Sequence, residues 1–214
     1  MNEIIFEWLA GNKIELLGAI LGLLYIFFFF FQSILTWPTG LLTSLIYTFV
    51  FFQSKFYADM GLQVYYVVIS IYGWYYWMQG AKTQNNIEHN DLPVKQVSKH
   101  LWIKLISSGI AIYFIILFVL LKFTDSDVPY MDSLTTALSI VATWMLAKKY
   151  IEHWLIWIFV DIFSAGLYVY KNLWATVVLF IVYTSMAIIG YFEWKKDLTK
   201  QIEDNTENYR HYRS

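Results

Sequence analysis

The fold is decided by WPTGLLTSLIYTFVFFQSKFYADMGLQVYYVVISIYGWYYW, the stretch from Trp37 to Trp77, because its pattern occurs twice in the chain. Trp154 lies 117 positions after Trp37, and Trp194 lies 117 positions after Trp77. Five more pairs match at this offset without a gap: Ala58 and Ala175, Leu62 and Leu179, Tyr66 and Tyr183, Ile71 and Ile188, and Gly73 and Gly190. Internal repeats of this kind are typical of membrane transporters.

The composition indicates a polytopic membrane protein. Hydrophobic residues make up 58% of the 214 residues and charged residues 14%, against about 25% charged in a soluble domain. The apolar segments occupy most of the chain, which leaves no room for a soluble domain of ordinary size. There is no cysteine, which excludes disulfides, thiolate nucleophiles and cysteine metal sites. The N-terminus carries Glu3 and Glu7 but no basic n-region, so we expect the first span to be retained.

Seven segments approach the roughly 17 to 25 apolar residues that cross a bilayer. They are Ile14 to Phe31, Ile34 to Phe52, Tyr57 to Trp77, Leu101 to Leu121, Ser133 to Ala147, His153 to Tyr170, and Trp174 to Trp194. The polar stretch from Gln79 to Lys99 reads as a solvated loop.

The distribution of basic residues predicts the orientation. With the N-terminus outside, the inner side holds eleven basic residues and the outer side four. The inner set is Lys82, Lys95, Lys99, Lys104, Lys148, Lys149, Lys195, Lys196, Lys200, Arg210 and Arg213, and the outer set is Lys13, Lys55, Lys122 and Lys171. We therefore expect the N-terminus outside and the C-terminus inside.

The repeat and the helix count together predict an all-α integral membrane fold of seven transmembrane helices. Repeat one covers about 14–77, repeat two about 133–194, and an inverting linker helix about 101–121, within one transmembrane domain, 1–194. This 3+1+3 plan makes the two triple-helix repeats parallel, related by an axis along the membrane normal. A pore or binding site on that axis follows from the symmetry. Residues 195–214 are predicted to form a solvated cytosolic tail.

A polar and aromatic face is predicted on the sixth helix. Trp154, Trp157, Asp161, Ser164 and Tyr168 recur at steps of three and four, which places them on one side of a helix. Asp161 lies about two turns inside its span, where a carboxylate is usually kept for a ligand, partner or ion pathway. An aromatic belt at the membrane interface is the alternative for the two tryptophans.

Other helices offer similar faces. The third helix carries Gln63, Tyr66, Ser70, Trp74 and Trp77 at the same spacing. Hydrogen bonding to neighbouring helices is the alternative for Gln63 and Ser70. Trp77 is expected to be an anchor at the membrane interface. Two further faces are Trp37, Gly40, Ser44 and Tyr47 on the second helix, and Thr136, Ser139 and Thr143 on the fifth. The fifth-helix hydroxyls fit tight helix packing equally well.

Indole rings, one buried carboxylate and scattered amides and hydroxyls suit a small, flat, cationic molecule that carries hydroxyl groups. A metal ion would need clustered His, Asp or Glu, whereas His89, His100, His153 and His211 lie at loops or helix ends. We predict no metal, no cofactor and no nucleic-acid partner.

The stretch from Trp37 to Trp77, with its YAD, LQ and YGW elements, resembles a signature of the PnuC family of bacterial vitamin transporters. HWLIWIFVDIFSAGLYVYKNLW, from His153 to Trp174, is similar to the family's second signature. The resemblance runs from about Glu15 to Trp194. It implies a SWEET-like seven-helix fold, a homotrimer in the bacterial inner membrane, and import of nicotinamide riboside by facilitated diffusion with alternating access.

By that resemblance, Gln63 and Asp161 are the polar substrate contacts, and Trp37, Trp154, Trp157 and Tyr168 the aromatic surroundings. Tyr66, on the same face as Gln63, completes the expected substrate-binding set. Thiamine is the alternative substrate, since it is also a cation with a flat ring, whereas the neutral, larger riboflavin fits less well.

A membrane enzyme and a vitamin sensor are the two alternatives to a transporter. A membrane enzyme would need paired carboxylates, a nucleophile with its base, or metal-ligand spacing inside the spans, and none is present. A non-transporting vitamin sensor would bind its ligand without accumulating it.

Overall fold

The computed structural model describes residues 21, 24–53, 57–83, 92–124, 126, 128–170 and 174–211, and nearly all of these are helical. The chain divides into two compact units, residues 1–92 and 93–214. Half of the first predicted span lies outside the described residues, and residues 24–30 of the other half are helical.

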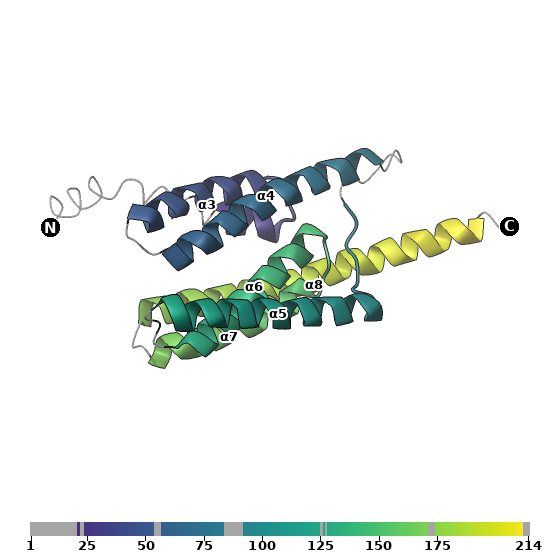
Figure 1. Cartoon of the computed structure of the whole chain (residues 1–214). Helices are drawn as coiled ribbons and strands as arrows, with labels where there is room; N and C mark the ends of the chain where they lie inside the picture. Colours follow the sequence, from purple (N-terminus) through teal and green to yellow (C-terminus); the bar gives the residue numbers. More distant parts are fainter. Residues whose placement is uncertain are drawn as a thin grey trace. The chain divides into compact units, whose positions relative to one another are not determined.

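The first unit contains α3 (Thr36–Gln53) and α4 (Tyr57–Thr83), which pack against each other along their length (Figure 1). Ser44 of α3 and Ser70 of α4 are buried, whereas Leu45, Phe49, Val64 and Val68 are exposed apolar side chains. Polar groups therefore face inward and apolar groups outward, which is the arrangement expected when lipid is the solvent.

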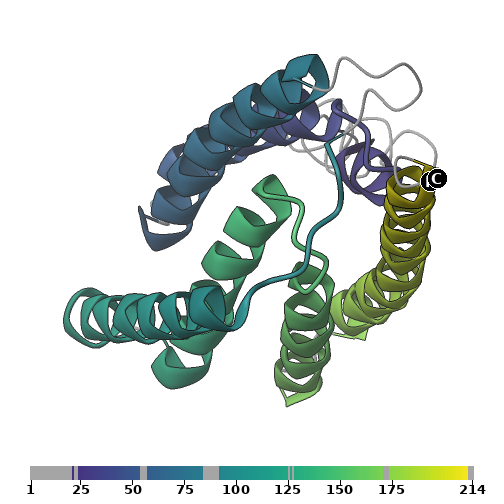
Figure 2. The same cartoon turned by 90° about the vertical axis from the view of Figure 1, so that its right-hand side faces the viewer.

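The second unit contains α5 (Lys99–Phe123), α6 (Pro129–Ala147), α7 (His153–Tyr170) and α8 (Trp174–His211). α6 packs against both α5 and α7, and α7 packs against α8, as the end-on view in Figure 2 shows. Leu105 of α5 and Val141 and Met145 of α6 form a buried cluster between the first two of these helices.

Hydroxyl side chains in the helices bond to their own backbone. Thr43 Oγ1 donates to Thr39 O at 2.8 Å, Thr143 Oγ1 to Ser139 O at 2.7 Å, and Thr184 Oγ1 to Phe180 O at 2.8 Å. Such bonds satisfy a polar group without water. For Thr143, which is 4% exposed, they favour the helix-packing interpretation of the fifth predicted span.

Among the described residues, α5 is the one helix that is long and apolar enough to cross a membrane by length and hydropathy alone, and His153–Leu167 is a shorter apolar segment. α4 is rich in Tyr and Trp, which are less apolar than aliphatic residues and favour membrane interfaces. This aromatic content lowers the hydropathy of α4, and four threonines lower that of α3.

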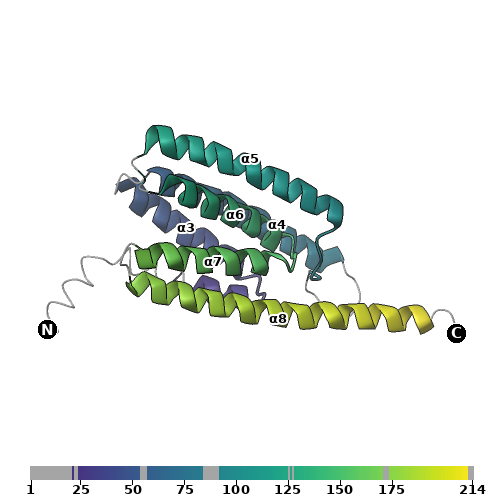
Figure 3. The same ribbon diagram turned by 90° about the horizontal axis from the view of Figure 1, so that it is seen from below.

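The predicted ends of the helices lie within six residues of the observed ends, except at the C-terminal end of α8. The sixth predicted span matches α7 without any shift, and the others differ by a few residues at their ends. α8, however, continues as a single helix of 38 residues to His211, so the predicted solvated tail is helical as far as that residue. Figure 3 shows this extension of α8 running on past the start of α7.

The predicted loop from Gln79 to Lys99 is corrected at both ends. α4 extends to Thr83, and residues 92–98, which we call the strap, lie against the turn between α6 and α7. Lys95 N donates to Lys149 O and Ile151 N to Lys95 O, each at 2.9 Å. Val94 of the strap is 4% exposed, so the second half of this segment is packed and not freely solvated.

Candidate substrate-binding residues

The turn before α7 sets the position of its first residues. Lys149 has a left-handed φ of 55°, and two hydrogen bonds close the end of α6: Lys149 N to Leu146 O at 2.8 Å and Tyr150 N to Met145 O at 3.0 Å. These bonds form a Schellman motif, which ends one helix and fixes where the chain goes next. α7 then begins at His153.

The same turn occurs before α3. Gln32 has a φ of 53°, with Gln32 N bonded to Phe29 O at 3.1 Å and Ser33 N to Phe28 O at 3.0 Å. Gln32 lies 117 positions before Lys149, so the internal repeat extends to a backbone conformation that the sequence comparison did not detect. A left-handed residue other than glycine is uncommon, and its recurrence at equivalent positions marks the two segments as structural equivalents.

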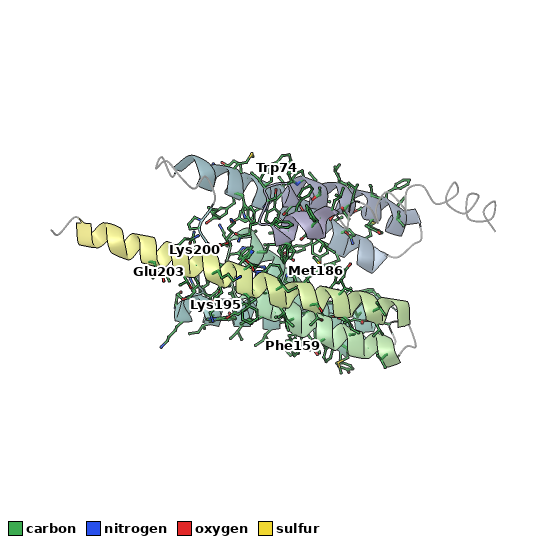
Figure 4. All side chains as sticks on the ribbon, turned by 180° about the vertical axis from the view of Figure 1, so that it is seen from behind. Trp74, Phe159, Met186, Lys195, Lys200 and Glu203 are labelled. Atoms are coloured by element: carbon green, nitrogen blue, oxygen red, sulfur yellow. The ribbon has the colours of Figure 1, made fainter. Side chains whose placement is uncertain are left out.

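The predicted polar face of α7 is turned inward. Trp154, Asp161 and Ser164 are buried, and Trp157 is partly buried. The opposite side of the helix exposes apolar side chains, which are Leu155, Phe159, Ile162 and Val169. Phe159 is seen on this outer side of α7 in Figure 4. The backbone of Tyr168 belongs to α7, but its side chain lies outside the described part of the structure.

Two groups on this face have unused hydrogen-bonding capacity. Asp161 is 5% exposed, and within the described ranges no hydrogen bond or ion pair reaches its carboxylate. The indole Nε1 of Trp157, one turn earlier, is buried and also lacks a hydrogen-bond partner among the described residues. A buried carboxylate and a buried donor without partners are costly in a protein interior, and a bound cation with hydroxyl groups can satisfy both.

The equivalent face of α3 is less polar. Gly40 and Ser44 stand 117 positions before Trp157 and Asp161, and Ser44 is 6% exposed. The first repeat therefore has a buried hydroxyl where the second has a buried carboxylate. The charge, and with it the capacity to attract a cation, belongs to the second repeat.

On α4, Gln63 and Tyr66 are partly buried, and Ser70 and Trp77 are buried. The opposite side of α4 exposes Val64, Val68, Ile71 and Tyr75. The predicted face of α4 is therefore its more buried side. Trp77 is 4% exposed, so it is a packed residue and not an anchor at the lipid interface.

Trp37 and Trp154 are only 1% and 2% exposed. Each ring lies against a glycine of the neighbouring helix, Gly73 and Gly190 respectively. The aromatic-belt alternative is therefore excluded for Trp154, because a belt residue reaches the headgroup region. Packing accounts for the position of both rings, and their contact with substrate stays a prediction.

Glu152 is a residue that the sequence analysis missed. Its Oε1 accepts the backbone N–H of Val97 at 2.9 Å and so holds the strap to the start of α7. The two residues are far apart in sequence, and no local pattern predicts the bond. Within the described ranges, no group of three or more His, Asp or Glu residues could hold a metal ion.

Helices that bury polar and aromatic faces and expose apolar ones, together with one helix of membrane-crossing length and hydropathy in the described part of the chain, are characteristic of membrane proteins that carry small molecules. The profile of the nicotinamide mononucleotide transporter family matches residues 12–196, and the chain belongs to that family. It is therefore a membrane transporter and not an enzyme.

Relatives with assigned names agree with this classification. The nicotinamide riboside transporter PnuC of Escherichia coli is 27% identical, with 85% of this chain and 84% of the relative covered. That of Neisseria mucosa is 24% identical, with 92% and 77% covered. The riboflavin/roseoflavin transporter RibM of Streptomyces davaonensis is 23% identical, with 84% and 83% covered.

The fold matches the crystal structure of the vitamin B3 transporter PnuC with a TM-score of 0.70 at 21% sequence identity. The match covers 92% of this chain and 87% of that chain. At this level of identity the likeness concerns the fold.

Proposed function

We propose that this transporter imports nicotinamide riboside, and that Asp161 of α7 is the residue that attracts the substrate's positive ring. The observation that carries the proposal is a buried carboxylate without a partner among the described residues, one turn from the unpartnered indole donor of Trp157. Nicotinamide riboside has a pyridinium cation and ribose hydroxyls, which complement these two groups. The names of the relatives from Escherichia coli and Neisseria mucosa support the same substrate.

The remaining substrate contacts are proposed from the sequence prediction. Gln63 and Tyr66 of α4 supply an amide and a phenol, and Trp37, Trp154 and Tyr168 supply aromatic surroundings. The partly buried positions of Gln63 and Tyr66 support this assignment.

The test is substrate affinity of Asp161→Asn, which removes the charge and keeps the shape of the side chain. The substitution keeps an acceptor for a ribose hydroxyl and removes the charge; a hydrogen bond to a charged group exceeds a neutral one by about 1–1.5 kcal/mol, so we expect the affinity for nicotinamide riboside to fall at least about 5-fold. The matched control is Glu203→Gln, which neutralises an exposed carboxylate on the α8 extension (Figure 4) and should change nothing. An Asp161→Asn protein with native affinity would contradict the proposal.

Riboflavin is the second candidate substrate because one relative is named for it. Its ring system is neutral, so riboflavin binding should not depend on the charge at position 161. Titrating the purified protein with nicotinamide riboside, thiamine and riboflavin in parallel separates the three. Thiamine, the alternative cation, should lose affinity in Asp161→Asn if it is the substrate.

We further propose facilitated diffusion by alternating access. In liposomes, uptake of labelled nicotinamide riboside should be unchanged by an imposed proton gradient. Accumulation of the label inside the vesicles distinguishes transport from the mere binding expected of a sensor. Uptake driven by the gradient would instead assign a proton-carrying role to Asp161.

The 3+1+3 arrangement of parallel repeats in one transmembrane domain is proposed on the recurrence of the same helix-ending turn at Gln32 and Lys149, 117 positions apart. Because both turns precede the second helix of a repeat, they support copies that face the same way. In this plan α5 is the inverting linker helix.

The orientation in the bacterial inner membrane, with the N-terminus outside and the C-terminus inside, can be tested by cysteine labelling, since the chain has no cysteine of its own. Lys122→Cys should react with an impermeant maleimide in intact cells, and His100→Cys only after permeabilisation. The reverse pattern would invert the topology. The proposed homotrimer rests on the family resemblance and is tested by light scattering of the purified protein.

A further inference from the structure

In each of the two repeats, the ring of a buried tryptophan packs directly against the backbone of a glycine on the neighbouring helix, where any larger residue would collide with the ring. In the first, the ring of Trp37 on α3 contacts Gly73 on α4 so closely that a Cβ at position 73 would lie 2.4 Å from it. Real Cβ contacts essentially never fall below 3.0 Å. One turn further along α4, Trp77 meets the Trp37 ring edge to face, with centroids 5.4 Å apart and planes at 81°. We call these three residues the first joint.

The second joint repeats this arrangement with Trp154 on α7 and Gly190 and Trp194 on α8. A Cβ at position 190 would lie 2.5 Å from the Trp154 ring. The rings of Trp154 and Trp194 are 5.7 Å apart with planes at 90°. His153 adds a third ring to this joint, 4.7 Å from Trp154 and 4.8 Å from Trp194.

The indoles of both joints have little room to move. Trp37 and Trp154 are almost fully buried, Trp77 is 4% exposed and Trp194 is fully buried. Since interiors are close-packed, a ring pressed from one side by a backbone and from another by a second indole cannot yield. Small residues at helix contacts in membranes allow the backbones of two helices to approach closely, as α3 and α4, and α7 and α8, do here.

Not every glycine in these helices has this role. A Cβ added at Gly61 of α4 or at Gly166 of α7 would meet nothing within 4 Å. A Cβ at Gly40 of α3 would lie 3.0 Å from the Tyr25 ring, so a contact below 3.0 Å occurs at Gly73 and Gly190 alone among the described glycines of these helices, and these two are equivalent positions in the repeat. These two helix pairs, α3 with α4 and α7 with α8, also make the most extensive helix contacts within their units.

We infer that each joint makes its helix pair a single rigid body, so that the transport cycle moves α3 with α4, and α7 with α8, without separating them. This inference rests on the proposed alternating access. Asp161 and Trp157 lie on α7 beyond its joint, so their position relative to α8 stays constant while the pair moves. The joints are thus positioning elements, and they need not touch the substrate.

The test measures distances within each pair by electron paramagnetic resonance of spin labels. The cysteine-free chain allows labels at Phe49 and Val64 for the first pair, and at Ile162 and Val178 for the second, all of them exposed positions. We expect both distance distributions to be the same with and without nicotinamide riboside. A shift caused by the substrate within either pair would overturn the inference.

The same distances can be measured without substrate in proteins that carry substitutions at the joints. Gly73→Ala should shift or broaden the Phe49 to Val64 distribution, and the matched control Gly61→Ala should leave it unchanged. Adding Trp37→Phe to Gly73→Ala shortens the ring and should restore the distribution. An unchanged distribution in Gly73→Ala would overturn the inference.

For a Gly73→Ala protein that does not fold, Trp77→Leu is the second variant, because it removes the edge-to-face contact and keeps an apolar side chain. It should broaden the same distribution, and an unchanged width would refute the joint. In the second pair, Gly190→Ala against Gly166→Ala repeats the comparison. If nicotinamide riboside is not the substrate, the unsubstituted protein will not take it up. The distances measured in the glycine variants would still test the joints in that case.

Discussion

Replacing Glu152 by alanine should release the strap from the start of α7. The carboxylate accepts a hydrogen bond from Val97 N–H at 2.9 Å. The strap is also held to the turn between α6 and α7 by the two backbone hydrogen bonds of Lys95. A hydrogen bond to a charged acceptor contributes about 1.5–3 kcal/mol, and its loss leaves the Val97 N–H unsatisfied. The free energy of opening the strap should fall by this amount.

Hydrogen exchange measured by mass spectrometry reads this free energy directly. Amide exchange in a peptide that covers residues 92–98 should accelerate about 10- to 150-fold in Glu152→Ala. Glu152→Gln is the matched variant, because it keeps an acceptor oxygen without the charge. Its effect should be smaller, since a neutral hydrogen bond contributes about 0.5–1.5 kcal/mol.

The peptides around Leu117 in the second half of α5 serve as the internal reference, because Leu117 is buried and does not belong to the cluster around Leu105 against which Val97 of the strap packs. Their exchange should be the same in all three proteins. Equal acceleration in the strap and in α5 would mean global destabilisation, and unchanged exchange in the strap would mean that Glu152 does not hold it. Either result would refute the reasoning.

Three further substitutions test the helix ends and the packing, each by thermal unfolding in detergent. Gln32→Gly should raise the stability by about 0.5–1 kcal/mol, because glycine adopts a positive φ without the steric cost borne by other residues; Ser33→Gly, without that φ, should lower it. Trp194→Ala should cost about 3–5 kcal/mol, whereas Phe192→Ala at an exposed position should cost little. Gly109→Ala should stabilise α5 by about 0.5–1 kcal/mol, because its Cβ would meet the nearest side chain at an ordinary 3.6 Å; a loss of stability there would contradict the packing described.

The helices themselves were predictable because apolar length is the main requirement for crossing a bilayer. His153 and Tyr170 are the ends of α7 in both the sequence prediction and the structure. The end of α8 was not predictable in this way. Beyond Trp194 the chain becomes charged, which ends an apolar span, but Lys, Glu and Gln are good helix formers and the helix continues.

The inward faces of α4 and α7 were also predictable, because helical spacing places residues three and four apart on one side. The packing of Trp37 and Trp154 was not. Their aromatic chemistry pointed to substrate, and the spacing of the repeat gave their equivalence, but only the structure shows which glycine each ring contacts. Contacts between distant segments, such as that of Glu152 with Val97, carry no periodic signal at all.

The unequal faces of α3 and α7 have an evolutionary consequence. A duplicated gene starts with two identical halves, and the features that survive in both are those that neither half can lose: here the left-handed turn and the tryptophan against its glycine. The Gly40 and Ser44 positions escaped this constraint, since their counterparts are Trp157 and Asp161. On the proposed role of Asp161, this division of labour lets new substrates evolve through a few residues of one half, while the inherited architecture of both remains untouched.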